Sequence, residues 1–383
     1  MATAKATLFL RLGIAAVWLV HGLYNKLLGG SPRHLAIVQS VPGLSGATGI
    51  SMLDAIGVFE VAVACWIVSG RRLRLCTAVQ VAALLSMNVL ELTFARHLLL
   101  WPAGLLPVNA GFLSLMWLAA DPAAAARFFA RLRRHPLPID AHFRECLTLT
   151  YALPASALRP LLPPGLELET VGDFGFVAVA IVRTERLRPA GVPGPLGCDF
   201  VLAGYRIFTR FQTARGRSIR GLRILRSDAD RRLMVAGGNL LTHYNYHRCR
   251  AVIESAGNRL DVAISTADGG GDLELTVDLT DPSLPAGSPF ASVREARRFA
   301  GPLPYTFDYE AETHSIVAIE AQRANWRPSP VAVRVRRMSF FAQPAFAGCT
   351  PILAAAFRVS HINYRWRRGV LHSLAPAQTE VCA

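Results

Sequence analysis

The sequence of 383 residues lacks several features that common enzyme mechanisms require. Lysine is absent after Lys26, which excludes any mechanism that forms a Schiff base on a lysine in the rest of the chain. The seven cysteines include no Cys-x-x-Cys pair and no zinc-type spacing, so neither a structural metal site nor a disulfide framework is indicated. The G-x-S-x-G, Walker A and strand-following G-x-G-x-x-G motifs are also missing, and the common hydrolase, nucleotide and dinucleotide functions lose support.

Acidic residues are scarce in the first third of the chain. Residues 1–139 contain only Asp54, Glu60, Glu91 and Asp121, whereas the other 22 of the 26 acidic residues follow residue 139. Hydrophobic residues make up 52% of the whole chain, which is more than a soluble protein of this length needs for its core. This uneven distribution predicts two domains that face different solvents.

Four segments of the first third are long and apolar enough to cross a bilayer as helices of roughly 20 residues. They cover about 7–24, 50–69, 73–95 and 98–120. Pro102 and Pro107 are expected to bend the last segment or to shift its start. The sequence therefore predicts an all-α four-helix transmembrane bundle over residues 1–122, followed by a basic juxtamembrane helix and linker over 123–139.

Basic residues flank these segments unevenly. If both chain ends lie on one side of the membrane, eight basic residues lie on that side and three on the other. The eight are Lys5, Arg71, Arg72, Arg74, Arg127, Arg131, Arg133 and Arg134, and the three are Lys26, Arg33 and Arg96. The positive-inside rule predicts a multi-pass inner-membrane protein with cytoplasmic N- and C-termini. The net charge of +15 indicates contact with lipid headgroups rather than nucleic acid, because the later arginines form no single basic run.

Three polar side chains inside the predicted spans are candidate functional residues. A carboxylate in the middle of a span costs roughly 2.5–3.5 kcal/mol on insertion scales, so Glu60 and Glu91 are expected to face the bundle interior. Asn88 lies three residues before Glu91 and therefore shares its helical face. Two roles are open for these residues. They form a polar pocket linked to protons or to a quinone, or they make hydrogen bonds to His21, Gln80 or Asn109 that hold the helices together.

From about residue 140 the period of the apolar residues changes to two, which is typical of β-strands. The clearest strands lie at 174–182, 203–213, 273–279, 314–322 and 331–336. Helices are expected only at 154–162 and at 289–300, the latter with Ser288 as its cap. Because open strand edges invite aggregation, residues 140–375 are predicted to form a mainly-β (α+β) curved barrel or two paired curved sheets. Residues 376–383 are expected to be a tail.

The densest group of candidate site residues in the β domain is 243–248. On a strand, His243 and His247 would face the same side and could project together into a barrel. No third ligand is evident, so no metal site is predicted. His247 is the candidate catalytic acid or base, since the ordinary histidine pKa of about 6.5 suits proton transfer near neutral pH. The candidate ligand-binding residues are His243, Tyr246, Arg248 and Glu310. An amphipathic strand whose polar residues only pack or cap its end is the alternative.

Two motifs in the first third resemble the DoxX-like family. Residues His21–Leu27 are similar to the glycine and Lys-Leu signature after the family's first helix. Residues Gly57–Glu60, followed by Gly70 and a basic turn, are similar to its second-helix pattern. The resemblance implies a four-helix membrane protein, and some members are associated with quinone-linked sulfur oxidation. A quinone-linked redox subunit, with the β domain as a sensor or scaffold, is therefore an alternative function.

The β domain resembles the uncharacterised YqjF-like family of the acetoacetate-decarboxylase-like superfamily, through the motifs Leu158–Leu166, Tyr246–Arg248 and Arg294–Tyr305. The resemblance implies a curved barrel with a central pocket for a small acid. Where the decarboxylases have Pro-Lys-Lys, this chain has Asn245, Tyr246 and His247, and Ala152 stands at the position of an arginine. The resemblance thus implies a pocket without the lysine chemistry.

These observations predict a membrane-anchored protein of unknown activity. Its cytoplasmic β-barrel is expected to bind a small anionic molecule of the carboxylate type without Schiff-base chemistry. The sequence indicates no cofactor, with a quinone implied only under the redox alternative. The residues do not decide whether the protein is an enzyme.

Overall fold

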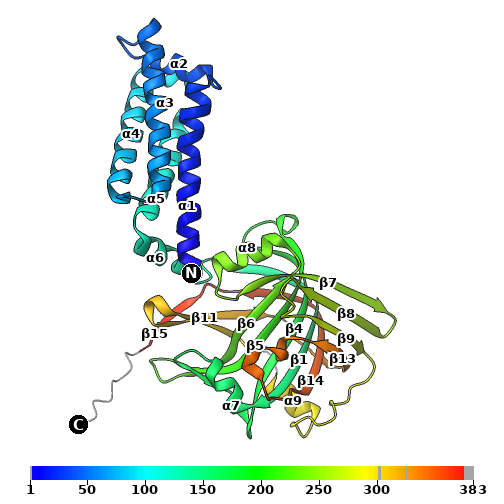
Figure 1. Ribbon diagram of the computed structural model, residues 1–383. Helices are drawn as coiled ribbons and strands as arrows, with labels where there is room; N and C mark the ends of the chain where they lie inside the picture. Colours follow the sequence, from blue (N-terminus) through cyan, green and yellow to red (C-terminus); the bar gives the residue numbers. More distant parts are fainter. Residues whose placement is uncertain (1, 301–302, 325, 375–383) are drawn as a thin grey trace, which may run out of the picture. The chain divides into compact units, whose positions relative to one another are not determined.

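The computed structural model describes residues 2–300, 303–324 and 326–374. The tail predicted at 376–383, and Gly301 and Pro302 of the third YqjF-like motif, lie outside the described residues. The chain divides into two compact units, Met1–Phe129 and Ala130–Ala383 (Figure 1). The first unit consists of helices and the second is mainly β, as the sequence predicts.

Four helices of the first unit are long and apolar enough to cross a membrane, over Thr7–Leu27, Gly46–Ser69, Leu73–Phe94 and Pro102–Ala120. The N-terminal helices are α1 (Ala2–Leu19), the π-helical η1 (Val20–Leu27), α2 (Pro32–Gln39), α3 (Gly46–Ser69), α4 (Leu73–Phe94), the 3₁₀ turn η2 (Arg96–Leu98), α5 (Pro102–Ala120) and α6 (Pro122–Leu132). The fourth candidate span begins at Pro102 rather than at 98, because a proline suits the first turn of a helix, where its missing N–H is not needed.

Close contact between η1 and α3 depends on two glycines. A Cβ atom added at Gly22 would lie 2.7 Å from the carbonyl oxygen of Gly57, and one added at Gly57 would lie 2.8 Å from the Leu27 side chain. Any larger residue would therefore push the two helices apart. The glycines of both DoxX-like motifs thus bring η1 against the part of α3 that carries Glu60.

The strands of the second unit form a closed ring. In the order β6 (Ser218–Ala229), β10 (Tyr305–Glu310), β11 (Ser315–Arg323), β14 (Ile352–Trp366), β1 (Ile139–Pro154), β4 (Phe174–Pro189) and β5 (Cys198–Gln212), each strand pairs with the next, and β5 pairs back with β6. The smaller strands β2 (Leu166–Leu168), β3 (Thr170–Val171), β12 (Ser329–Pro330) and β15 (Val370–Ser373) add to β5, β4, β14 and β11 respectively. The ring is the curved barrel expected from the period-two pattern, and closure removes the open edges.

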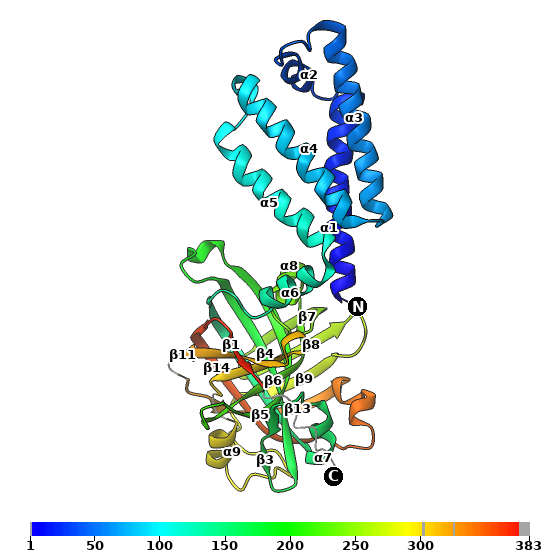
Figure 2. The same ribbon diagram turned by 90° about the vertical axis from the view of Figure 1, so that its left-hand side faces the viewer.

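A second layer extends from the last residues of β6. It contains β7 (Tyr246–Ala256), β8 (Arg259–Thr266), β9 (Leu273–Asp278) and β13 (Ala332–Met338), paired antiparallel in that order. These strands lie to one side of the barrel strands in both views (Figures 1 and 2). The short helices of the unit are α7 (Ala155–Leu158), η3 (Arg159–Leu161), η4 (Gly194–Leu196), α8 (Arg232–Leu241), α9 (Val293–Phe299), η5 (Ala311–Thr313), η6 (Phe340–Ala342) and η7 (Pro344–Phe346).

Strands β1, β4 and β5 bury both of their faces, because successive side chains of a strand point to opposite sides. One face carries residues such as Leu147, Val179 and Tyr205, which pack in one core with residues of β8 and β9. The alternate residues, such as Ala180 and Arg206, point to the inside of the ring. The interior of the barrel is therefore lined by a residue set that includes an arginine.

Three local expectations differ from the structure. Helix α8 (Arg232–Leu241) forms where the sequence was not expected to form a helix. The strand expected over 243–248 begins only at Tyr246, because the preceding Asn245 has a positive φ of 52° and ends a loop. The helix expected over 289–300 is α9, whose cap is Ser292 rather than Ser288. The Ser292 side chain accepts a hydrogen bond from the N–H of Glu295, and the Glu295 carboxylate accepts one from the N–H of Ala291. These two hydrogen bonds stabilise a helix that begins after Ser292 rather than after Ser288.

Candidate functional site

The inside of the barrel contains a cavity of about 110 Å³. Its walls are mainly apolar and aromatic side chains, contributed by β1, β4, β5, β6, β10, β11 and β14 together with the loops that carry Tyr244 and Trp326. Two arginines, Arg206 on β5 and Arg323 at the end of β11, also line it. The cavity is thus an apolar space with two fixed positive charges.

Neither of these arginines has a carboxylate partner among the residues that the structure describes. The Nε of Arg206 is buried and has no hydrogen-bond acceptor within residues 2–300, 303–324 and 326–374. Arg323 donates from Nη2 to the carbonyl oxygen of Leu303 at 2.7 Å and from Nη1 to the hydroxyl of Tyr364 at 3.4 Å, and both acceptors are neutral. Both side chains are half-buried, and charges removed from water are normally paired, so two arginines without an acid in one cavity indicate a site for an anion.

Aromatic rings hold the guanidinium of Arg323 in place. Its central carbon lies 4.8 Å from the ring centroid of Trp326 and 5.7 Å from that of Tyr364. Burial lowers the pKa of Arg323, which reflects how little solvent stabilises this charge. Burial also raises the pKa of the neighbouring Cys146 thiol to about 11, even though Arg206 and Arg323 both act to lower it. Cys146 is therefore a neutral thiol near both guanidinium groups at neutral pH.

Two further hydrogen-bond donors in the cavity wall lack partners. The hydroxyl of Tyr244 and the indole N–H of Trp326 are buried without an acceptor among the described residues. An unsatisfied buried donor costs about 1–3 kcal/mol, and native proteins contain few of them. Together with the Nε of Arg206, these groups give the cavity a surplus of donors that a ligand rich in acceptors would satisfy.

The structure separates the residues that the sequence predicts for this site. Tyr246 is buried and lines the cavity, where the Asn239 side chain holds it by hydrogen bonds to its backbone N–H and carbonyl, each of 2.9 Å. The other four predicted residues, His243, His247, Arg248 and Glu310, are not among the side chains that line the described cavity. His243, His247 and Arg248 lie close to Tyr246 in sequence, and Glu310 is the last residue of β10. Their side chains nevertheless do not line the cavity of the barrel.

His247 and its neighbours have partners elsewhere. The Nε2 of His247 lies 3.2 Å from the side-chain oxygen of Asn245, and its Nδ1 lies 3.4 Å from a carboxylate oxygen of Asp268. His243 lies in the loop before β7 with a buried, unpartnered Nε2, and burial lowers its pKa. Arg248 is exposed. In the described part of the chain, no group of three or more His, Cys, Asp or Glu residues could hold a metal ion.

Glu310 is fully buried and belongs to a closed ion pair. Its carboxylate accepts hydrogen bonds from Nε and Nη2 of Arg134, at 2.7 and 2.5 Å, and from the hydroxyl of Thr313 at 2.6 Å. Burial acts to raise the pKa of Glu310, but the hydrogen bonds from Arg134 and Thr313 outweigh it and hold the pKa below its ordinary value. The geometry indicates that Glu310 anchors the segment before β1.

The sequence contains a signal for Arg206 that the sequence analysis missed. Arg206 is two residues before Phe208 and four after Leu202, so it shares the period-two phase of the apolar residues that face inward. A charged residue in that phase is unusual on a buried strand. Arg323 carries no such signal, because only the pairing of β11 with β14 brings it beside Tyr364.

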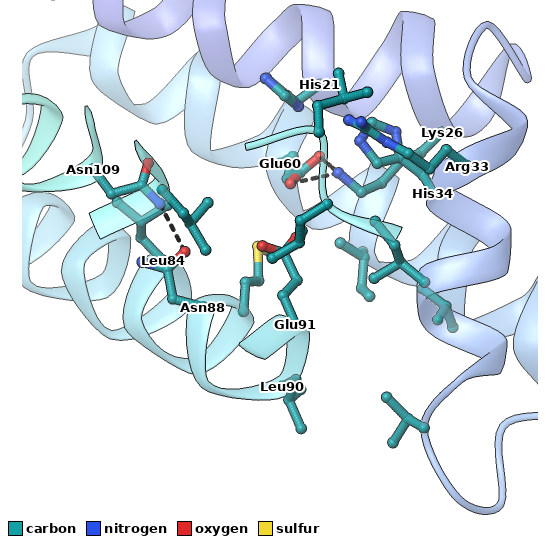
Figure 3. Close-up of a pocket in the computed structure, with 18 of the residues that line it drawn as sticks. His21, Lys26, Arg33, His34, Glu60, Leu84, Asn88, Leu90, Glu91 and Asn109 are labelled. Atoms are coloured by element: carbon teal, nitrogen blue, oxygen red, sulfur yellow. Dashed lines mark hydrogen bonds and ion pairs between the residues drawn. The ribbon is translucent and has the colours of Figure 1, made fainter. Parts of the chain in front are cut away.

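The helical unit contains a larger cavity of about 480 Å³ (Figure 3). Glu60 lies in it with 2% of its surface exposed, and Nζ of Lys26 donates to both of its oxygens at 2.8 and 2.7 Å. Glu60 is thus paired with Lys26, not with His21, Gln80 or Asn109. The side chain of Asn109 donates to that of Asn88 at 2.7 Å, whereas Glu91 faces the cavity without an ion pair among the described residues.

Basic side chains from η1 and α2 lie together at one end of this cavity. His21, Lys26, Arg33 and His34 gather there (Figure 3), and the rings of His21 and His34 are 5.8 Å apart. The Nε of Arg33 and the Nδ1 of His34 are buried without hydrogen-bond partners in the part of the chain that the structure describes. Burial, followed by the charge of Lys26, lowers the pKa of His34 to about 4, so its ring is neutral near pH 7.

Comparison with known families agrees with both units. Residues 15–117 match the DoxX-like family, and residues 140–377 match the family DUF2071, described as an uncharacterized conserved protein (COG2071). The chain belongs to the DUF2071 family. Both resemblances noted in the sequence are thereby confirmed, and the DoxX-like match with the four candidate spans identifies a membrane protein. No curated protein matches the chain.

Several solved structures are similar to the DUF2071 domain. An acetoacetate decarboxylase from Legionella pneumophila is 13% identical with a TM-score of 0.44, over 62% of this chain and 88% of that chain. An acetoacetate decarboxylase-like enzyme from Sphingomonas wittichii RW1 is 14% identical with a TM-score of 0.41, over 63% and 94%. The enduracididine biosynthesis enzyme MppR, complexed with pyruvate, is 14% identical with a TM-score of 0.41, over 62% and 90%. Values this low say nothing about chemistry, which rests on this chain's own residues.

Proposed function

We propose that the DUF2071 domain binds a small carboxylate inside its barrel, with the carboxylate group held between Arg206 and Arg323. The supporting observation is that these two arginines line one cavity and have no acidic partner among the described residues. A carboxylate would neutralise the charge and accept the unused hydrogen bonds of Arg206, Tyr244 and Trp326. The rest of the ligand would lie against the apolar wall.

The size of the cavity limits the ligand. Its volume of about 110 Å³ is well below the roughly 300–1,000 Å³ of sites for drug-sized molecules. The ligand is therefore a short-chain acid rather than a long one. The domain contains no lysine that could form an imine, so the ligand is not attached covalently to a lysine side chain.

Calorimetry on the full chain in detergent micelles tests this proposal. Butyrate, acetate and pyruvate are titrated alongside butyramide, which has the shape of butyrate without its charge. We expect the carboxylates to bind and the amide to bind at least about tenfold more weakly, because a hydrogen bond to a charged group contributes about 1.5–3 kcal/mol. Equal affinity for butyrate and butyramide, or no binding of any acid, would contradict the proposal.

Matched variants locate the site. Arg206→Gln and Arg323→Gln should each weaken butyrate binding about tenfold or more, whereas Arg248→Gln removes an exposed arginine and should leave it unchanged. The catalytic or binding role of His247 stays a prediction, and His247→Ala decides it. Since the His247 ring contacts Asn245 and Asp268, we expect this variant to bind butyrate normally. Loss of binding in His247→Ala alone would favour a site at the start of β7.

We also propose that the DUF2071 domain lies on the cytoplasmic side of the inner membrane. The support is the excess of basic residues in the segments on the side of the chain ends. The free cysteines of the domain fit a reducing compartment. The quinone-linked redox function implied by the DoxX-like resemblance stays a prediction.

A further inference from the structure

We propose that the cavity of the helical unit binds a single-chain amphipathic carboxylic acid, such as a fatty acid. Its carboxyl group would lie at Arg33 and His34, and its hydrocarbon chain would lie along the apolar wall. This site is independent of the barrel cavity, because all of its lining residues belong to the first unit.

The polar end of the cavity selects the head group. Arg33 and His34 are consecutive residues of α2, and each has one buried nitrogen without a partner among the described residues. The Nε of Arg33 is a donor, and a neutral His34 whose other nitrogen contacts the Asn25 carbonyl presents Nδ1 as an acceptor. One carboxyl group satisfies both, since its proton passes to Nδ1 of His34 and the resulting carboxylate accepts hydrogen bonds from Nε of Arg33 and from the new N–H of His34.

The end of the cavity that carries Arg33 favours an acid over a neutral or cationic head. Lys26 is already bound to Glu60, which leaves Arg33 as the cation without an ion pair among the described residues that line the cavity. A ligand with a cationic head would be repelled by Arg33 and could not accept its hydrogen bond. Glu91 faces the same cavity, so a second acidic group on the ligand would be repelled. The ligand is therefore acidic at one end only.

The rest of the cavity suits a hydrocarbon chain. Its wall includes Ile37, Leu44, Met52, Ile56, Leu84 and Met87. A volume of about 480 Å³ falls within the roughly 300–1,000 Å³ of small-molecule sites. Figure 2 shows α4 and α5 diverging from α1 and α3 toward the end of the bundle that carries α2, where the cavity lies.

Photolabelling of the full chain in nanodiscs tests the site. The probe is hexadecanoic acid that carries a diazirine on its chain, and labelled peptides are mapped by mass spectrometry. We expect labels on α3 and α4 peptides that line the cavity. Excess hexadecanoate should remove them, whereas hexadecanol and hexadecyltrimethylammonium should not. Equal competition by hexadecanol, stronger competition by decylubiquinone or by phosphatidylglycerol, or labels confined to residues outside the cavity would overturn the proposal. This comparison needs no variant.

Two substitutions should change labelling in opposite directions. Arg33→Gln should lower the affinity for hexadecanoate about tenfold or more, while Glu91→Gln should raise it, because it removes a like charge. Arg96→Gln removes an arginine outside the cavity, on the turn between α4 and α5, and should have no effect. If Arg33→Gln does not fold, His34→Gln provides the same test. Unchanged affinity in Arg33→Gln or His34→Gln, or weaker binding in Glu91→Gln, would contradict the assignment of the head group.

A bulky substitution tests the position of the chain. Ile56→Phe should narrow the cavity and reduce labelling, whereas Ile50→Phe adds the same volume to an exposed position of the same helix and should not. Melting temperatures of both variants show whether each is folded. Equal labelling of the two folded variants would place the chain outside the cavity.

Discussion

The two units differ in how they compensate charges in apolar surroundings. In the helical unit, Glu60 is nearly fully buried and Lys26 neutralises it through two short hydrogen bonds. In the barrel, Arg206 and Arg323 face one cavity without an acid among the described residues. The barrel does contain closed pairs, such as Arg134 with Glu310. A charge in apolar surroundings that has its partner is part of the fold, whereas one without a partner is a candidate for ligand binding.

The first prediction concerns the orientation of the chain in the membrane, for which each position lies on one side or the other. Reporter fusions at Gly30, between the first two candidate spans, and at Ala383 should report opposite sides of the membrane, with Ala383 cytoplasmic. The physical reason is the excess of basic residues on the side of the chain ends. Fusions that place Ala383 outside would reverse the orientation, and fusions on the same side would contradict the count of four spans.

A second prediction removes the partner from the closed pair. Glu60→Gln should destabilise the helical unit by about 3–5 kcal/mol, because it leaves Lys26 as a charge without compensation. Unfolding of the full chain in mixed micelles, followed by tryptophan fluorescence, measures the change. The double variant Lys26→Met with Glu60→Gln is the control and should recover most of the loss. A single variant as stable as the wild type would show that Lys26 reaches water or another acid.

A third prediction uses a buried acid of the barrel. Asp308 is 1% exposed, accepts a hydrogen bond from Arg223 at 2.5 Å, and has its pKa raised to about 6 by burial, although Arg223 acts to lower it. A carboxyl with a higher pKa in the folded state loses stability when the pH rises from its unfolded pKa to its folded one. The stability advantage of the wild type over Asp308→Asn should therefore shrink between about pH 4 and pH 6, by at most a few kcal/mol at ~1.4 kcal/mol per pKa unit.

Chemical denaturation at several pH values measures this difference. Subtraction of the Asp308→Asn curve removes the contributions of the other acids, such as Asp268, whose pKa is lowered by Arg226. A difference that grows with pH over the same window would mean that Arg223 dominates over burial and that the pKa of Asp308 is lowered.

The smallest effect on stability is expected for the removal of Arg206, whose charge has no acidic partner among the described residues. Arg206→Met keeps much of the apolar stem and removes the guanidinium, so the melting temperature of the ligand-free protein should stay the same or rise slightly. Butyrate should raise the melting temperature of the wild type, because it binds the folded state, but not that of Arg206→Met. A marked loss of stability without ligand would assign Arg206 to the fold and remove the contrast with Lys26.

Features that depend on nearby residues could be predicted from the sequence. The four candidate spans follow from hydropathy over about 20 residues, and the barrel strands follow from the period of two. The loss of lysine chemistry follows from composition alone. Even there, local competition changed details, since Ser292 rather than Ser288 caps α9 and the strand at 243–248 starts late, at Tyr246.

Only the tertiary structure decided which charges meet. The sequence contains Lys26 and Glu60, but helix packing across Gly22 and Gly57 makes them a pair. Closure of the barrel brings Arg323 beside the cavity that Arg206 lines and leaves His247 at the start of β7 with Asn245 and Asp268. The physical reason is that burial and charge compensation depend on distances between side chains far apart in the chain, which local patterns of hydropathy and periodicity do not contain.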